Sequence, residues 1–238
     1  GEVKHSEVIE TSADLVSLAI ANKHQAVIVS TKSLVVYDPT RHQILQRVPI
    51  AETPAAVVYD LVDQSYVVVM KEGGFHRYKE NENGTWLVTD RWVNQGERIF
   101  QAAILPNSEG IYTTDASGAI VKWQPPLQRH VFLSGEDAGS AMSVDISFAS
   151  PSPSWPQVAI GCRLGAYIHD FNRRTRQPLE NKTQEVTAIL HRPGKLSLLS
   201  SFSYEAILLH HEDSSTGSPW NSRREVIETN SHGGLAVS

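Results

Sequence analysis

The sequence predicts an all-β fold of the β-propeller type, a ring of repeated four-stranded antiparallel blades. Short apolar runs of four to eight residues, rich in Val and Ile, alternate with clusters of Gly, Asn, Asp, Pro and Ser along the 238 residues. Runs of this length and composition are typical of strands, and no long stretch carries an apolar repeat at helical spacing. The runs recur at a fixed period, which indicates a propeller.

The predicted third strand of each blade shows the period most clearly. Apolar runs that end in an aromatic residue or a histidine recur, and their penultimate residues are Tyr37, Tyr78, Trp123, His169 and His210. The spacings between these residues are 41, 45, 46 and 41, and a four-stranded blade takes about 40 to 45 residues. A second β-branched run usually precedes each of them across a tight polar turn, so that the two runs form a predicted hairpin.

A third apolar run lies upstream of each hairpin, and a more polar fourth run follows it. The polar run suits an outer edge strand that meets water. The runs predict one domain over 1–238, with blades at about 12–50, 53–93, 98–136, 140–181 and 184–229. Because SEVIETSADLVSLAI near the start resembles REVIETNSHGGLAVS at the end, we expect residues 2–10 to form an outer strand that closes the ring or pairs with the last blade.

One blade resembles a WD repeat. TTDASGAIVKW at 113–123 has a polar turn with Asp and Gly, alternating apolar residues, and Trp123 at the end of the third strand. Asp38 and Asp170 end two weaker versions of the motif. The resemblance covers nearly the whole chain as a pattern, without convincing copies of the Gly-His and Trp-Asp pairs that fix a hydrogen-bond network in the family's blades. It implies a divergent WD-repeat propeller.

Five blades are visible in the sequence, whereas the family usually has about seven, with six and eight also known. Three explanations stay open: a fragment of a six- or seven-bladed ring, an open ring that a partner's blade completes, and a true five-bladed ring. The first two are favoured because GGLAVS at 233–238 reads as the start of a further blade. An incomplete ring exposes blade edges, and we expect a partner to cover them.

Composition limits the classes of partner and compartment. The formal net charge of -5 provides no overall positive field that would hold nucleic acid or an anionic membrane. Cys162 is the single cysteine, so an internal disulfide and a CxxC metal site are excluded and a cytoplasmic or nuclear location is expected. No apolar stretch is long enough for membrane insertion.

The sequence predicts no enzyme, and no catalytic, cofactor or metal site. Phosphate-binding and dinucleotide-binding glycine motifs, nucleophile elbows and HExxH motifs are all missing from it. Cys162 lies in an apolar run, where a thiol is usually inert packing. His210 and His211 are neighbours in a predicted strand and therefore point to opposite faces, which disfavours a shared metal ion.

Three arginines form the densest basic stretch, FNRRTRQP, on the predicted turn between a third and a fourth strand. Arg173, Arg174 and Arg176 could clamp a phosphate or an acidic peptide through bidentate hydrogen bonds. The alternative is a solvated loop, and it is favoured because the chain is acidic overall.

Four tryptophans are further candidates for partner contacts. Trp86 and Trp92 lie on a predicted outer strand, either exposed for an interface or packed between blades. Trp155 and Trp220 lie in Pro- and Ser-rich segments that read as long loops, where each could anchor locally or on a partner.

We therefore expect a non-catalytic protein-interaction scaffold, a WD-repeat-like subunit of a multiprotein complex that holds peptides or other protein subunits. Part of this expectation rests on the resemblance. The alternative is an RNA-associated propeller in an RNA-modifying or RNA-processing complex, which requires the three arginines and Lys182 to form one basic stripe. A catalytic or sugar-binding propeller would instead need carboxylates or aromatic residues that converge in the channel.

Overall fold

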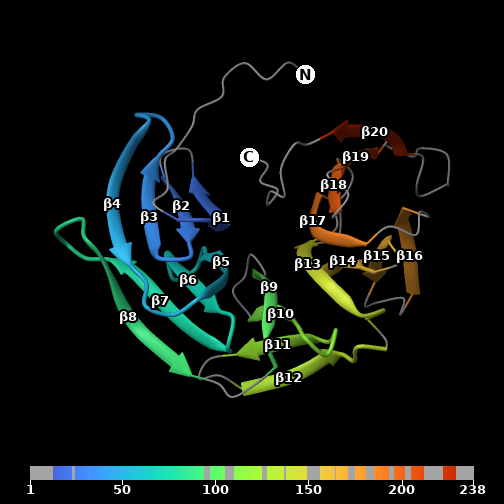
Figure 1. The fold of residues 1–238 in the computed structure, drawn as a ribbon, viewed down its shortest axis with the longest axis horizontal. Coiled ribbons are helices and arrows are strands. Elements are labelled where there is room, and N and C mark those ends of the chain that lie inside the picture. The colour runs from blue at the N-terminus through green and yellow to red at the C-terminus, as the bar shows by residue number, and fades with distance from the viewer. Residues whose placement is uncertain are drawn as a thin grey trace.

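The twenty strands of the computed structural model form five antiparallel sheets of four strands each. The structure describes residues 13–22, 25–93, 97–104, 110–124, 128–136, 138–148, 156–163, 165–170, 175–180, 185–192, 196–201, 205–211 and 222–228. The sheets stand one after another around a common centre (Figure 1). The predicted all-β propeller is confirmed, and each sheet is one blade.

Each blade consists of four strands that are consecutive in the sequence. Blade 1 contains β1 (Leu15–Asn22), β2 (Gln25–Ser30), β3 (Ser33–Asp38) and β4 (Gln43–Pro49), and blade 2 contains β5 (Pro54–Asp60), β6 (Ser65–Met70), β7 (Gly74–Glu80) and β8 (Trp86–Val93). Blade 3 contains β9 (Ile99–Ile104), β10 (Ile111–Asp115), β11 (Ile120–Gln124) and β12 (Gln128–Leu133). Blade 4 contains β13 (Ala141–Phe148), β14 (Pro156–Cys162), β15 (Gly165–Asp170) and β16 (Thr175–Glu180), and blade 5 contains β17 (Val186–Arg192), β18 (Leu196–Ser201), β19 (Glu205–His211) and β20 (Ser222–Glu228).

The first strand of each blade is innermost, and the fourth is the outer edge (Figure 1). In blades 1 to 4, the innermost strand contacts the innermost strand of the next blade. The five residues that reveal the period in the sequence all lie on third strands, and Tyr37, Tyr78 and Trp123 are buried there. The large residue at this position therefore packs the blade.

Neighbouring blades pack face to face through aliphatic and aromatic side chains. Leu34 and Val36 of blade 1 share a buried cluster with Tyr66, Val68 and Trp86 of blade 2. Similar clusters join blades 2 and 3 through Val67, Phe75, Ile99 and Trp123, and blades 3 and 4 through Tyr112, Ile120, Val144 and Ile160. Full burial of such a side chain contributes about 1.5 to 3 kcal/mol, so these interfaces are the core of the ring.

A repeated backbone hydrogen bond ties each of the first three blades to the segment that leads into the next blade or begins it. The bonds are Ile50 N to Lys32 O at 2.9 Å, Ile99 N to Lys71 O at 2.8 Å, and Ala141 N to Gly118 O at 3.0 Å. Each carbonyl lies in the turn between the second and third strands. We call the face of the ring with these turns the upper face, and the opposite face the lower face.

Blade 3 also contains a side-chain hydrogen bond between its second and third strands. The Trp123 indole N–H donates to Thr113 Oγ1 at 2.8 Å, and both residues are buried. Asp115 holds the following turn by accepting from Ser117 N at 3.0 Å and Ala119 N at 3.2 Å. The polar turn and the tryptophan thus stabilise the same hairpin.

The ring is open between blades 1 and 5 as far as the described strands show (Figure 1). On blade 1, the face that points away from blade 2 carries Ile28, Val35 and Tyr37, and all three are buried. These side chains therefore do not form the exposed surface that was expected of an incomplete ring. Residues 2–10 and 233–238 lie outside the described residues. The part of the chain that is described has no helix long and apolar enough to cross a membrane.

Candidate functional site

Every innermost strand contains a β-bulge near its upper end. In blade 1, Leu15 pairs with Ser30 and Ser17 pairs with Val29, which leaves Val16 as the extra residue. The same shift leaves Ala55, Phe100, Met142 and Thr187 as extra residues in the other four blades. Bulges re-aim side chains and are frequent next to functional sites. We call Val16, Ala55, Phe100, Met142 and Thr187 the bulge ring.

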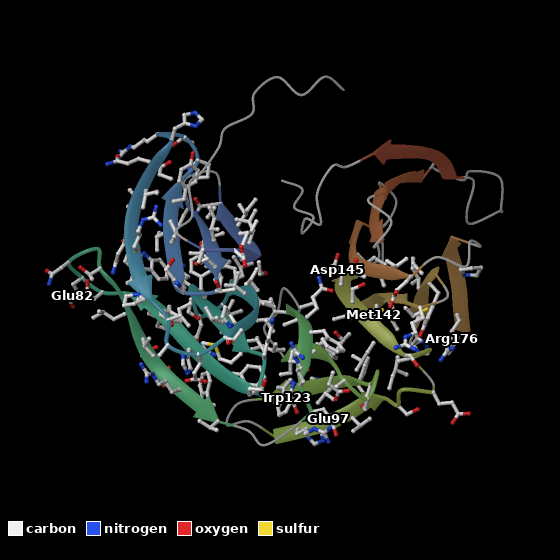
Figure 2. The ribbon with its side chains drawn as sticks, in the orientation of Figure 1. Glu82, Glu97, Trp123, Met142, Asp145 and Arg176 are labelled. Carbon is white, nitrogen blue, oxygen red and sulfur yellow. The ribbon has the colours of Figure 1, made fainter. Side chains whose placement is uncertain are left out.

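Near the upper ends of the innermost strands, at the mouth of the ring's centre, Val16, Phe100 and Met142 present apolar surface, whereas Ala55 is buried. Phe100 is 45% exposed, and Leu15, which directly precedes Val16, is 55% exposed. Val16 and Met142 are partly exposed. Figure 2 shows Met142 beside the innermost strand β13, with Asp145 nearer the centre. An exposed phenylalanine and an adaptable methionine suit contact with an apolar side chain.

Side chains directly after three of the bulges hold consecutive innermost strands together. The bonds are Val57 N to Ser17 Oγ at 3.1 Å, Val144 N to Gln101 Oε1 at 3.1 Å, and Ser143 Oγ to Val186 O at 3.3 Å. Blade 2 has Ala56 at this position. These bonds fix the backbone at the mouth, so that binding of a partner would cost little conformational entropy there.

His76 and Glu52 link the connection between blades 1 and 2 to strand β7. The His76 Nε2 atom lies 3.2 Å from Glu52 Oε1, and the histidine side chain is buried. Burial lowers the pKa of His76 below its ordinary value of 6.5, Arg91 lowers it further, and Glu52 acts in the opposite direction. The folded protein therefore favours neutral His76 at neutral pH.

We expect this histidine to make the protein less stable in mild acid. The unfolded chain takes up a proton near pH 6.5, whereas the folded chain takes it up only at lower pH, so stability falls across that interval. Melting temperatures measured at about pH 7.5 and 5.5 should differ more for the wild type than for His76→Gln. An equal loss in both proteins would contradict this role.

Trp86 is not available as a surface contact, because it is 3% exposed. Its ring packs 5.1 Å from Tyr66, centroid to centroid, and Gln46 of blade 1 makes two hydrogen bonds with its backbone. The interpretation of Trp86 as an exposed contact is therefore wrong, and packing between blades 1 and 2 is what the structure shows.

Trp92 lies on the same strand but faces the other neighbour. It packs at the border of the cluster between blades 2 and 3 and remains partly exposed. The Arg77 guanidinium carbon lies 5.3 Å from the centre of its ring. A register shift at Thr89, between the pairs Arg77–Asp90 and Tyr78–Val88, explains why two even-numbered tryptophans point to opposite faces.

Arg176 lies on strand β16, where it pairs with His169, and not on the turn as predicted. It is exposed at the periphery of the ring, with its guanidinium carbon 4.9 Å from the centre of the Tyr167 ring (Figure 2). Arg173, Arg174, Trp155 and Trp220 lie outside the described residues. No cluster of three or more metal-ligating side chains occurs within the described ranges.

No pattern in the sequence predicts the bulge ring. Its five residues share no side-chain chemistry, and a bulge is defined by pairing between strands, which a single sequence does not display. A weak signal was present in Phe100, a large aromatic residue that directly follows Arg98 and Ile99 at the start of a strand.

Comparisons with known proteins identify the fold. No protein-family model matches the chain, and no curated protein matches it in sequence. The structure is similar to the β-propeller domain of Cps50 (Swd1) from Myceliophteria thermophila, with a TM-score of 0.64 and 10% identity over 92% of this chain and 73% of that one. Solved chains that match number 1382, so the fold alone does not select a function. By its sheet topology and this likeness, the chain is a β-propeller.

Proposed function

We propose that this chain is a non-catalytic protein-interaction scaffold, a WD-repeat-like subunit of a multiprotein complex, and that the bulge ring is its principal binding surface. The observation that carries the proposal is the exposed apolar surface of Leu15 and Phe100 on a hydrogen-bonded inner rim. Apolar and aromatic anchors dominate the energetics of protein interfaces. The partner would be a peptide or subunit that inserts an apolar side chain into the mouth.

The residue types at the mouth favour binding over catalysis. General acid and base catalysis needs titratable groups that converge on a substrate, whereas the bulge positions carry Val, Ala, Phe, Met and Thr. The fold similarity supports the architecture of a scaffold, and the function itself rests on the surface described above.

Affinity purification of the full chain, with mass spectrometry of what copurifies, tests the proposal. We expect a stoichiometric protein partner that survives nuclease treatment. Phe100→Asp should reduce its recovery about tenfold or more, since it places a charge at the apolar contact. Val131→Asp is the matched control, because Val131, like Phe100, is an exposed apolar residue of blade 3 but lies on the outer strand β12.

Two results would overturn the proposal. One is the failure to recover a stoichiometric partner. The other is recovery that Phe100→Asp and Leu15→Asp leave at the level of the control, with all variants folded by circular dichroism. Nuclease-sensitive recovery would favour the RNA-associated alternative.

A further inference from the structure

The lower face carries a second surface, formed by two turns of blade 2. The first turn, 61–64, joins β5 to β6, and the second, 81–85, joins β7 to β8. The two turns lie on one edge of the sheet, because β6 pairs with β7. The Lys79 Nζ atom lies 3.5 Å from Asp63 Oδ1 and connects them. We call residues 61–64 and 79–85 the blade 2 lower edge.

The first turn presents two aliphatic side chains to solvent. Leu61 is 58% exposed and Val62 is 68% exposed, although polar residues are the usual choice in turns. Asp60 fixes the turn, since its Oδ1 atom accepts from Val62 N at 3.2 Å and from Asp63 N at 3.1 Å. The two apolar side chains are therefore held in a defined position.

An ion pair with a buried arginine of strand β7 holds this turn against the sheet. The Arg77 side chain is 8% exposed, and its Nη1 atom lies 3.4 Å from Asp60 Oδ2 and also contacts Asp63. Both ends of the acidic turn are thus tied to strand β7. Anchoring of this kind reduces the conformational entropy that a binding partner would have to remove.

Acidic side chains lie on both turns of the blade 2 lower edge. Glu80 and Glu82 are exposed, and Asp63 is about half exposed. The cation of this edge, Lys79, is engaged with Asp63. Figure 2 shows Glu82 at the tip of the turn that projects from the periphery of the ring. Asn81 orders that turn, because its Oδ1 atom accepts from Asn83 N at 3.0 Å and Thr85 N at 2.9 Å.

We propose that the blade 2 lower edge docks a basic segment of a partner protein through an apolar anchor. An apolar side chain of the segment packs on Leu61 and Val62, and flanking Lys or Arg side chains pair with Glu80 and Glu82. The exposed apolar pair supplies the contact, and charge complementarity selects the partner and orients it. This surface lies on the face opposite the bulge ring, so that the scaffold holds two partners at once.

Short fluorescent peptides provide the probe for a binding test with the full chain. One set has Leu or Phe at the centre and Lys or Arg on both sides, a second replaces the centre by Ser, and a third replaces the basic residues by Glu. Fluorescence anisotropy should show binding of the first set only, and added salt should weaken it.

Variants then locate the site. Leu61→Asp with Val62→Asp should weaken binding of the first peptide set about tenfold or more, and Glu80→Lys with Glu82→Lys should have a similar effect. Two exposed residues away from this edge provide the matched controls. Val131→Asp, on the outer strand of blade 3, controls for the aspartate substitutions, and Glu97→Lys, on the connection at the upper face, controls for the charge reversals. The controls should bind as the wild type does.

The proposal is overturned if no basic peptide binds, if acidic peptides bind equally well, or if the Leu61 and Val62 variant keeps the wild-type affinity. Self-association that this variant abolishes would also overturn it, because the occupant would then be a second copy of the chain. Phe100→Asp should leave peptide binding here unchanged, which separates this proposal from the one for the bulge ring.

Discussion

Asp60→Ala should lower the free energy of unfolding by about 1.5 to 3 kcal/mol, the usual contribution of hydrogen bonds to a charged group. Asp60 is 5% exposed and serves two structures at once, the turn after β5 and the Arg77 guanidinium. The substitution leaves a buried guanidinium with Asp63 as its remaining carboxylate partner on this edge. Urea unfolding followed by circular dichroism measures the loss.

Asp38→Ala is the matched control for that prediction. Asp38 also ends a strand and caps a turn, accepting from Thr40 N at 2.8 Å and Arg41 N at 3.2 Å. Its ion-pair partner Arg41 has a side chain that is 75% exposed, so this loss should be only about 1 kcal/mol, as for a lost cap. If Asp60→Ala costs no more than Asp38→Ala, the buried pair does not stabilise blade 2.

Gly161→Ala should destabilise the junction of blades 4 and 5 by about 1 to 3 kcal/mol, the cost of overpacking. A Cβ atom on Gly161 would lie 2.7 Å from Val186 Cγ1 and 2.8 Å from Val186 O, and would also press on Ser143 Oγ. Since Val186 O belongs to the backbone of β17, the added methyl group displaces the innermost strand of blade 5. It also disturbs the bond from Ser143 Oγ to Val186 O.

Hydrogen exchange measured by mass spectrometry locates this effect. Protection should fall in β17 and β18, while blade 1 keeps its protection. Gly74→Ala is the control. The atoms nearest to a Cβ atom there belong to the side chains of Glu52 and Met70, at 3.2 Å and 3.3 Å, and flexible side chains can move aside. Unchanged exchange in blade 5 would contradict the prediction.

Much of the architecture could be predicted from sequence because strand periodicity is a local property. The large residue on each third strand sits between two apolar runs, and Tyr37, Tyr78 and Trp123 mark that position through burial alone. Trp92 and Trp86 show the limit. Alternation places both on one face, and only the register shift at Thr89, which arises from pairing with β7, sends them to different blades.

The two surfaces depended on information that a single sequence lacks. The bulge ring arises because each innermost strand has one residue more than its partner strand at that point, and no residue type predicts this. Arg77 lies within GFHRYKE and looks like an ordinary solvent-facing strand residue until Asp60 and Asp63 are brought beside it. Leu61 and Val62 directly follow the strand-like run AAVVYD in the sequence. The sequence alone therefore does not show that they are exposed in a turn.

The hydrogen bonds at Lys32, Lys71 and Gly118 have a consequence for how the chain acquires its structure. Each carbonyl receives its donor from the segment that emerges shortly after the blade's own fourth strand. During synthesis from the N-terminus, the donor of this hydrogen bond therefore becomes available for each of these three blades before the following blade is complete. Assembly can proceed in one direction, blade upon blade, without waiting for the C-terminus.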